Sequence, residues 1–370
     1  MASLTRFDEI IDAFNRQSNW CQEFGSSFTS QLIGKLAEDF GKRGIVFELI
    51  SSWKGNIIAD ALALRICGAF HYLALSGNSP QLRAIYPPQN SNWNITEIWP
   101  IALMELHSRK DWFADFIISP PQTNEVRRAI GLYLGICRAA QNWDGPIDIL
   151  ELGASAGLNQ NLDMFDYNLP DFKKQSGYGV ELGVDDWRGN QFSGGRDMKF
   201  RNRAACDQNP LNPEHDGLML QAYIWPDQKE RLDRCQAAID LACAQKTSVD
   251  KADAADWTTQ KLQTRANDAL TIIFHSVFFQ YPPEKTRTQI NKSILTAISN
   301  SSKAAPLAWV RLEPSAVLFG IDGKTMQTDN DWPSIGHIVD VIDFDFDNNT
   351  LRRRILARID PHVRWIDWQD

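Results

Sequence analysis

Residues 147–159 read IDILELGASAGLN and join a short apolar run to a pair of glycines. The run at 147–152 has the length and composition of a buried strand, and the glycine after it indicates a tight turn. Gly153 allows the chain to turn sharply, and Gly157 allows the following helix to pack close to the sheet or to a ligand. The free N–H groups at the start of that helix are expected to face a polar ligand.

More apolar runs follow the turn and alternate with helical stretches. The expected strands lie at 199–205, 248–250, 269–274 and 307–312, and the clearest helix lies at 226–245. Strands that alternate with helices indicate a parallel sheet with right-handed crossovers. Two longer runs, 337–346 and 351–359, flank the turn cluster DNNT and predict an antiparallel hairpin. This pattern predicts an α/β class: a Rossmann-like methyltransferase fold, mostly parallel, with an antiparallel edge hairpin.

The first part of the chain has a different character. Apolar residues recur there at three- and four-residue spacings, without the alternation of a half-buried strand. A helix is expected at 124–141, with Thr123 as its N-cap. We therefore expect two domains, a helical N-terminal region at 1–143 and a Rossmann-like domain at 144–370. The polar, glycine-rich stretch 177–196 is expected to be a surface insertion.

Composition narrows the class of partner. Among 370 residues, 43% are hydrophobic and 23% charged, which is typical of a soluble globular protein, and the net charge is −8. A negative surface disfavours nucleic acid and anionic membranes, so a small-molecule substrate is expected. Residues 1–14 are too acidic for a signal peptide, and Asp60 and Arg65 interrupt the apolar stretch 58–75, which therefore indicates a core helix.

Cysteine and histidine usage points to the same class. The six cysteines are scattered without a Cys-x-x-Cys pair, which favours buried thiols in a reducing compartment. The six histidines are isolated, so no metal site is expected. The sequence therefore predicts a cytoplasmic protein without a bound metal.

Polar residues stand at the ends of the predicted strands, where parallel sheets bind their ligands. The acid-x-Gly-x-x-x-Gly pattern that begins at Glu151 resembles the first motif of S-adenosylmethionine-dependent methyltransferases. This resemblance implies that the loop holds the methionine end of the cofactor, that an acid after the second strand binds the ribose, and that the residue after the third strand meets the adenine. The implied loop residues are Glu151, Gly153, Ala154, Ser155, Gly157 and Asn159.

Asp207 is the candidate for the ribose acid, and Asp253 with Ala254 matches the adenine position. Asp207 lies fifty residues beyond Gly157, whereas the usual spacing is about twenty. Asp185 or Asp186 therefore remains an alternative for the ribose. Each acid alone could equally be a solvated loop residue or a helix cap.

His275 ends the strand that usually faces the transferred methyl group. Its pKa lies near neutrality when unperturbed, so it is the candidate general base for an oxygen or nitrogen nucleophile. A histidine that only bonds backbone at the strand end is the structural alternative.

Two other function classes fit the same residues. Residues 153–157 also match Gly-x-Ser-x-Gly, the nucleophile elbow of α/β-hydrolases. Ser155 would then be the nucleophile, with Asp253 or Glu313 as the acid and His337 or His362 as the base. The helical character of the preceding residues argues against this alternative, because hydrolases place several strands before the elbow. The third class is a Rossmann-like binding protein without catalysis.

Several motifs together resemble one bacterial family, known as domain of unknown function 2332. They are QTNEVRR at 122–128, ELGASAGLN at 151–159, WPDQ at 225–228 with Arg231, the His275-Ser276 strand end with QYP at 280–282, and Pro361-His362. Arg127 departs from the pattern, since the family often has valine-glycine at 126–127. The resemblance implies a methyltransferase-like fold and directs attention to Asn124, Arg127, Trp225 and Tyr281 as candidate substrate-binding residues.

Overall fold

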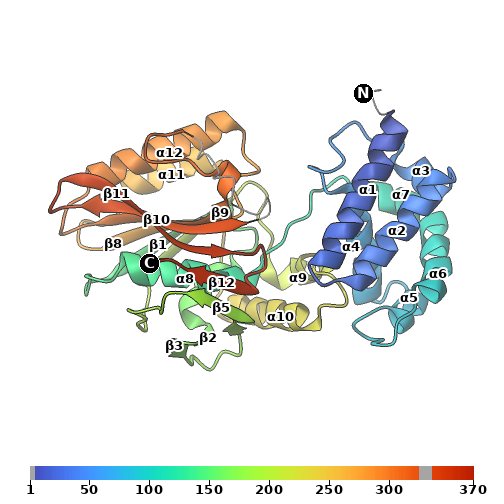
Figure 1. Cartoon of the computed structure of the whole chain (residues 1–370), viewed down its shortest axis with the longest axis horizontal. Coiled ribbons are helices and arrows are strands. Elements are labelled where there is room, and N and C mark those ends of the chain that lie inside the picture. The colour runs from blue at the N-terminus through green and yellow to red at the C-terminus, as the bar shows by residue number, and fades with distance from the viewer. Residues whose placement is uncertain (1–4, 325–335) are drawn as a thin grey trace. The chain divides into compact units, whose positions relative to one another are not determined.

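A computed structural model describes residues 5–324 and 336–370 (Figure 1). Contacts between Cα atoms divide the chain into two compact units. The first contains the described residues up to Thr123 together with His215–Gln236, and the second contains Asn124–Glu214 and Ala237–Asp370. The expected domain boundary was 143/144, so the observed first unit ends earlier in the chain and receives a second segment.

The first unit is helical, as its spacing of apolar residues predicts. Its elements are α1 (Arg6–Glu23), α2 (Ser27–Gly41), α3 (Ile45–Ile50), α4 (Leu62–Ser76), α5 (Pro80–Ile85), α6 (Ile95–Ser108) and α7 (Lys110–Phe116), and α9 (Pro213–Ala222) and α10 (Lys229–Ala244) lie partly within it. The central helix α4 is buried on nearly all sides, in agreement with the predicted core helix. No described helix is long and apolar enough to span a membrane.

A nine-stranded sheet forms the second unit (Figure 1). Its strands are β1 (Ile147–Leu152), β5 (Asp186–Gly189), β6 (Asn202–Asp207), β7 (Asp250–Lys251), β8 (Leu270–Ser276), β9 (Leu307–Pro314), β10 (His337–Asp345), β11 (Thr350–Ile359) and β12 (Trp365–Trp368). Their order is β5-β12-β11-β10-β9-β8-β1-β6-β7. The predicted α/β class with a large, mostly parallel sheet is therefore correct.

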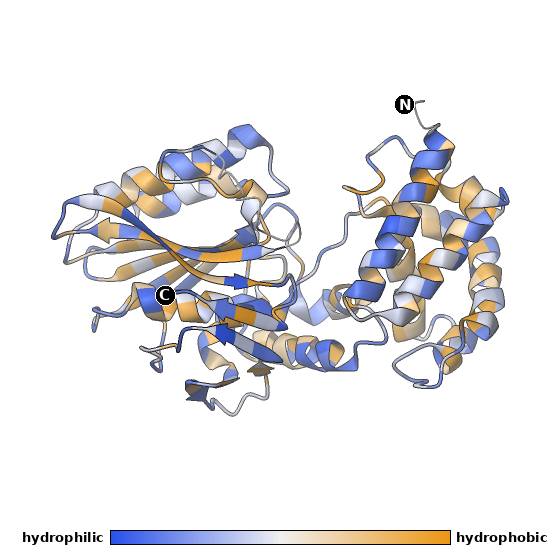
Figure 2. Cartoon of the chain, viewed as in Figure 1, coloured by the Kyte–Doolittle hydropathy of each residue, from blue (hydrophilic) through white to orange (hydrophobic). Residues whose placement is uncertain are grey.

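The order of the strands changes direction at β1. From β1 the chain continues to β6 and β7 on one side, and then crosses to β8 and β9 on the other, all with parallel pairing. Strands β8 and β9 are buried almost throughout, which explains why they read as continuous apolar runs. Figure 2 shows the apolar residues concentrated in these strands.

The antiparallel hairpin is also confirmed, but its predicted position at the edge of the sheet is wrong, because β12 pairs with β11 and β5 pairs with β12. Strand β10 pairs with β11 from His337↔Ile359 to Asp345↔Thr350, with one irregularity at Val339/Asp340. The expected surface insertion at 177–196 is wrong in part, because it contains β4 (Glu181–Gly183) and β5. Strand β5 joins the large sheet through β12, and β4 joins a small sheet of order β3-β2-β4 with β2 (Asp166–Leu169) and β3 (Phe172–Lys174). Backbone pairing permits polar side chains at such edges, so composition alone did not reveal these strands.

Helices cover both faces of the large sheet (Figure 1). On one face, α8 (Ala129–Ala139) packs against β8, β9 and β10, and on the other lie α11 (Ala254–Gln263) and α12 (Glu284–Ser299). Gly135 lets α8 approach closely, since a Cβ there would lie 2.6 Å from Val310. The predicted helix at 124–141 starts late, because η1 (Val126–Arg128) precedes α8 and the side chain of Glu125, rather than that of Thr123, caps η1.

A buried ion cluster joins β9 to the hairpin. Arg311 and Asp340 are completely buried and form two hydrogen bonds of 2.8 and 2.6 Å, and Arg353 Nε donates a third at 2.6 Å to Asp340. Burial alone would raise the pKa of the Asp340 carboxyl, but the two guanidinium groups hold this pKa below its usual value. The cluster is stable only while all its members are present.

Asp340→Asn should therefore lower the free energy of unfolding by roughly 3–5 kcal/mol, because it leaves the Arg311 charge buried without its counter-ion. Urea denaturation measures this loss. Asp347→Asn is the matched control, since Asp347 is 87% exposed and its ion pair with Lys303 should contribute less than about 1 kcal/mol. Equal effects of the two substitutions would contradict the structural role given to Asp340.

Candidate functional site

The glycine turn follows β1, the strand at which the strand order changes direction. Three of its residues have left-handed backbone: Gly153 at φ +65°, Ser155 at +52° and Gly157 at +73°. Glycine adopts this conformation freely, whereas for serine it is uncommon. The following helix is a 3₁₀ segment, η2 (Leu158–Met164), with non-helical angles at Asn161. The turn is therefore sharper, and the helix shorter, than the sequence predicts.

The N–H groups of the turn already have acceptors within the protein. Ala154 N donates to Cys206 O (3.1 Å), Ser155 N to Asp207 Oδ2 (2.8 Å), Ala156 N to Asn124 Oδ1 (3.0 Å) and Gly157 N to Ala154 O (2.7 Å). These four N–H groups, which precede the helix, are thus not free to face a ligand. The reason is that two side chains from other segments, those of Asp207 and Asn124, reach the turn.

Side chains of the protein also fill the space beside both glycines. A Cβ at Gly153 would overlap the ring of Phe278, and one at Gly157 would overlap the side-chain amide of Gln160. Thr247 and Val249 lie close to Gly157 as well. Both positions therefore require glycine for packing within the chain, in addition to the left-handed backbone.

Glu151 lies directly before the turn and is buried. Burial raises the pKa of its carboxyl well above the usual value, and the nearby negative charge of Asp207 adds to this shift. Among the described residues, its Oε2 has no hydrogen-bond partner, and the same holds for the buried Ser155 Oγ and Asn159 Oδ1. Buried polar atoms in native proteins usually have a partner, so three unpartnered atoms at one turn indicate room for a polar ligand or water.

Asp207 ends β6 beside β1 and holds the turn. Its Oδ2 accepts the N–H of Ser155, and its Oδ1 accepts the N–H of Asn209 at 2.9 Å. The alternatives lie elsewhere: five strands separate β1 from β5, where Asp186 pairs with Arg188. Asp185, next to Asp186, pairs with Arg127. Of the three candidate ribose acids, Asp207 is the one whose side chain forms a hydrogen bond with the glycine turn.

Asp253 lies after β7 and caps α11. Its Oδ1 accepts the N–H groups of Ala255 (2.9 Å) and Asp256 (3.3 Å), and Asp253 itself is exposed. Ala254 is the first residue of that helix. Since β7 pairs with β6, both residues lie at the same edge of the sheet as Asp207.

His275 lies at the end of β8 and is completely buried. Its Nδ1 is 2.7 Å from Glu313 Oε1, which belongs to the neighbouring strand β9. The rings of Phe278, Phe279 and Trp309 surround the imidazole at centroid distances of 5.7, 4.4 and 5.7 Å. Its Nε2 has no hydrogen-bond partner within residues 5–324 and 336–370. His275 thus bonds the carboxyl group of Glu313. The structural alternative expected a bond to backbone instead.

The candidate substrate residues do not all gather at the turn. Asn124 bonds Ala156 there, whereas Arg127 donates from Nε to Gly183 O (2.8 Å) and pairs with Asp185. Tyr281 is 68% exposed.

Trp225 belongs to the helical unit, where it packs against the hydrophobic core. The residues after it connect α1 and α2: Asp227 accepts the hydroxyl of Ser26 (2.5 Å) and the N–H of Phe28 (3.0 Å), and Gln228 Nε2 donates to Phe24 O (3.0 Å). The WPDQ motif therefore has a structural role within its own unit.

Among the described residues, no hydrogen bond joins the hydroxyl of Ser155 to a histidine. The backbone of Ser155 has the strained conformation of a nucleophile elbow, but its hydroxyl has no hydrogen-bond partner in the described part of the chain. Of the proposed acids, Glu313 bonds His275 and Asp253 caps a helix.

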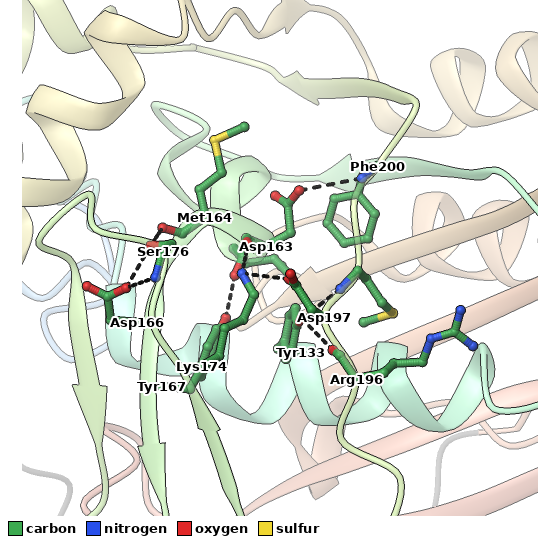
Figure 3. A network of polar contacts seen from close by, with 12 residues as sticks. Tyr133, Asp163, Met164, Asp166, Tyr167, Lys174, Ser176, Arg196, Asp197 and Phe200 are labelled. Carbon is green, nitrogen blue, oxygen red and sulfur yellow. Dashed lines mark hydrogen bonds and ion pairs between the residues drawn. The ribbon is translucent and has the colours of Figure 1, made fainter. Parts of the chain in front are cut away.

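A polar network anchors the segment that follows the turn (Figure 3). Asp163 forms a bidentate pair with Arg203 of β6 (2.6 and 2.7 Å), and its backbone oxygen accepts Lys174 Nζ. Tyr133 of α8 stacks on Tyr167 of the small sheet at 4.5 Å. These contacts fix η2 and the small sheet against the core of the second unit.

Two cavities lie at the opposite edge of the sheet from the turn. One, of about 230 Å³, lies against the amino ends of β1 and β6 and is lined by Asp148, Asn202 and Arg265 among others. The other, of about 410 Å³, lies near the hairpin turn. Neither cavity is lined by residues of the glycine turn, where Phe278 and Gln160 occupy the space beside the two glycines.

Within residues 5–324 and 336–370, no group of three or more His, Cys, Asp or Glu side chains could hold a metal ion. Five of the cysteines are buried free thiols, but Cys243 is exposed, contrary to expectation.

Sequence reasoning missed the roles of Phe278, Gln160 and the Glu313–His275 pair. The available signal was the pair of phenylalanines soon after His275, because a solvent-exposed loop is usually polar and two large apolar side chains there indicate packing.

The chain belongs to the family of uncharacterized proteins conserved in bacteria (DUF2332), whose model matches residues 11–368. The resemblance noted in the motifs is therefore confirmed at the level of the family. No curated protein and no solved structure matches the chain.

Glu151→Gln should change how stability depends on pH. Because the pKa of Glu151 is raised in the folded state, the unfolded chain loses this proton first as the pH rises above about 4.3. The free energy of unfolding of the wild type should therefore fall as the pH rises above about 4.3, whereas Glu151→Gln has no ionisable group at position 151. Thermal melts between about pH 4.5 and pH 8 measure this, and the advantage of the variant should grow with pH.

Glu181→Gln is the control, since Glu181 is exposed on β4. Its melting temperature should follow that of the wild type at every pH. A Glu151→Gln curve parallel to the wild type would mean that the carboxyl is solvated.

Proposed function

We propose that this protein binds S-adenosylmethionine at the carboxyl edge of its parallel strands and transfers the methyl group to a small molecule. The observation that carries the proposal is the glycine turn after β1, with a buried acid before it and Asp207 bonded to it. The acceptor is a compound with an oxygen or nitrogen nucleophile.

The strand order supports this placement. Numbered along the chain, the five parallel strands β7-β6-β1-β8-β9 stand in the order 3-2-1-4-5 of a Rossmann-like fold. Open sheets of this kind bind ligands outside the carboxyl ends of the strands, at the point where the order reverses. The glycine turn lies at that point.

The electrostatics of the turn favour a cation. Asp207 is close enough to Glu151 that its negative charge adds to the rise in the pKa of Glu151. A positive group beside them would stabilise the ionised form of Glu151 and give its unpartnered Oε2 an interaction. A sulfonium and an α-ammonium group both meet this requirement, whereas a phosphate does not.

The residues can be assigned on this basis. Glu151 with the turn residues Gly153, Ser155 and Asn159 would hold the methionine end, and Asp207 and Asp253 would bind the ribose and the adenine. The bound cofactor supplies an electrophilic methyl group, and the protein mainly has to align the acceptor with it. His275 Nε2, which carries no hydrogen bond, would take the proton of the acceptor.

Titration calorimetry tests the proposal. The wild type should bind S-adenosylmethionine with a Kd near the micromolar range, about −8 kcal/mol. Glu151→Gln should weaken this binding by about tenfold. The same variant should weaken the binding of S-adenosylhomocysteine less, because that ligand lacks the sulfonium charge. Glu181→Gln again provides the control and should leave both affinities unchanged.

Other outcomes favour other classes. Labelling of Ser155 by a fluorophosphonate, without heat from either ligand, would favour the hydrolase. Absence of both signals from a folded sample would contradict the proposal and leave a non-catalytic binding protein.

A further inference from the structure

The segment directly after β8 has an unusual backbone. Val277 lies at φ +50°, in the left-handed region, and its N–H donates to Leu312 O at 2.8 Å. A branched side chain at Cβ makes this conformation a genuine outlier. Such strain persists only where surrounding contacts compensate for it.

One oxygen atom supplies much of that compensation. Glu313 Oε1 accepts the N–H of Phe278 at 2.7 Å and that of Phe279 at 3.2 Å, and it also contacts His275 Nδ1 at 2.7 Å. The left-handed Val277 is what directs two successive N–H groups at a single acceptor. Glu313 is completely buried, so water does not compete for these bonds.

The same segment closes the site. The ring of Phe278 lies where a Cβ of Gly153 would be, and it contacts the imidazole of His275 edge-on. His275 has no exposed surface, and its Nε2 is buried. A ligand on the glycine turn and the Phe278 ring would compete for the space beside Gly153.

We propose that residues 277–279 form a cover over Gly153 and His275, that Glu313 fastens this cover, and that it opens to admit ligand. The identity of the ligand rests on the proposed function, but the movement of the cover does not. Opening breaks two hydrogen bonds to Glu313 and relieves the strain at Val277, so the released strain offsets part of the cost of breaking the bonds. It also gives Nε2 of His275 access to an acceptor.

The first test needs no ligand. Hydrogen exchange of the free protein should show the Phe278 and Phe279 amides opening without unfolding of β8. Glu313→Ala should accelerate their exchange by about tenfold or more, because it removes their acceptor. Diethylpyrocarbonate should modify His275 slowly in the wild type and several times faster in Phe278→Ala, with exposed His107 as the internal reference.

Phe344→Ala is the matched control, because Phe344 packs against the same hydrophobic core from the hairpin. It should leave His275 protected. Equal protection of His275 in Phe278→Ala and the wild type would overturn the proposal, and so would amides of the cover that exchange only with global unfolding. If Glu313→Ala does not fold, the Phe278→Ala comparison still decides.

The second test uses S-adenosylhomocysteine. If the closed cover competes with ligand, Phe278→Ala should lower the Kd by about three- to tenfold, because more of the protein is ready to bind. A raised Kd would make Phe278 part of the binding wall and contradict the cover. No binding by either protein would reject the proposed function, while the ligand-free test would still decide whether the cover opens.

Discussion

The hydrogen bond from Ser155 N to the carboxylate of Asp207 connects the central strand to its neighbour, and much of the candidate site depends on it. The bond compensates for the left-handed backbone of Ser155 and brings a negative charge close to Glu151. Burial and that charge together raise the pKa of the Glu151 carboxyl. A turn built in this way stabilises itself through side chains, and it differs from a phosphate-binding loop, which presents free N–H groups to an anion.

A site of this kind is closed in its resting state. The Phe278 ring occupies the space beside Gly153, and Glu313 holds the segment that carries this ring. Phe278 directly follows β8, which is adjacent to β1, and Glu313 lies in β9, the next strand along. Ligand binding would therefore be coupled to a movement at the ends of β8 and β9. The two cavities described above lie at the other ends of the strands, away from this segment.

The sequence predicted β1 at its observed bounds, because a short apolar run that ends at a glycine indicates a buried strand. It predicted the hairpin from two long apolar runs around a polar turn. It did not predict β5 or the small sheet, whose short strands depend on backbone pairing with distant segments. The pairing of His275 with Glu313 was likewise hidden, since 38 residues separate them. For Asn124, the residue was identified but not its bond to the glycine turn, because a side chain that reaches another segment leaves no periodic pattern.

The central claim is that the glycine turn after β1 binds a ligand. Hydrogen exchange with and without saturating S-adenosylhomocysteine, mapped along the whole chain, tests this most directly. The account predicts slower exchange at residues 151–159 and 207–211, together with altered exchange at 277–279. Unchanged exchange at the turn, or protection confined to the residues that line the cavities at the amino ends of the strands, would contradict it.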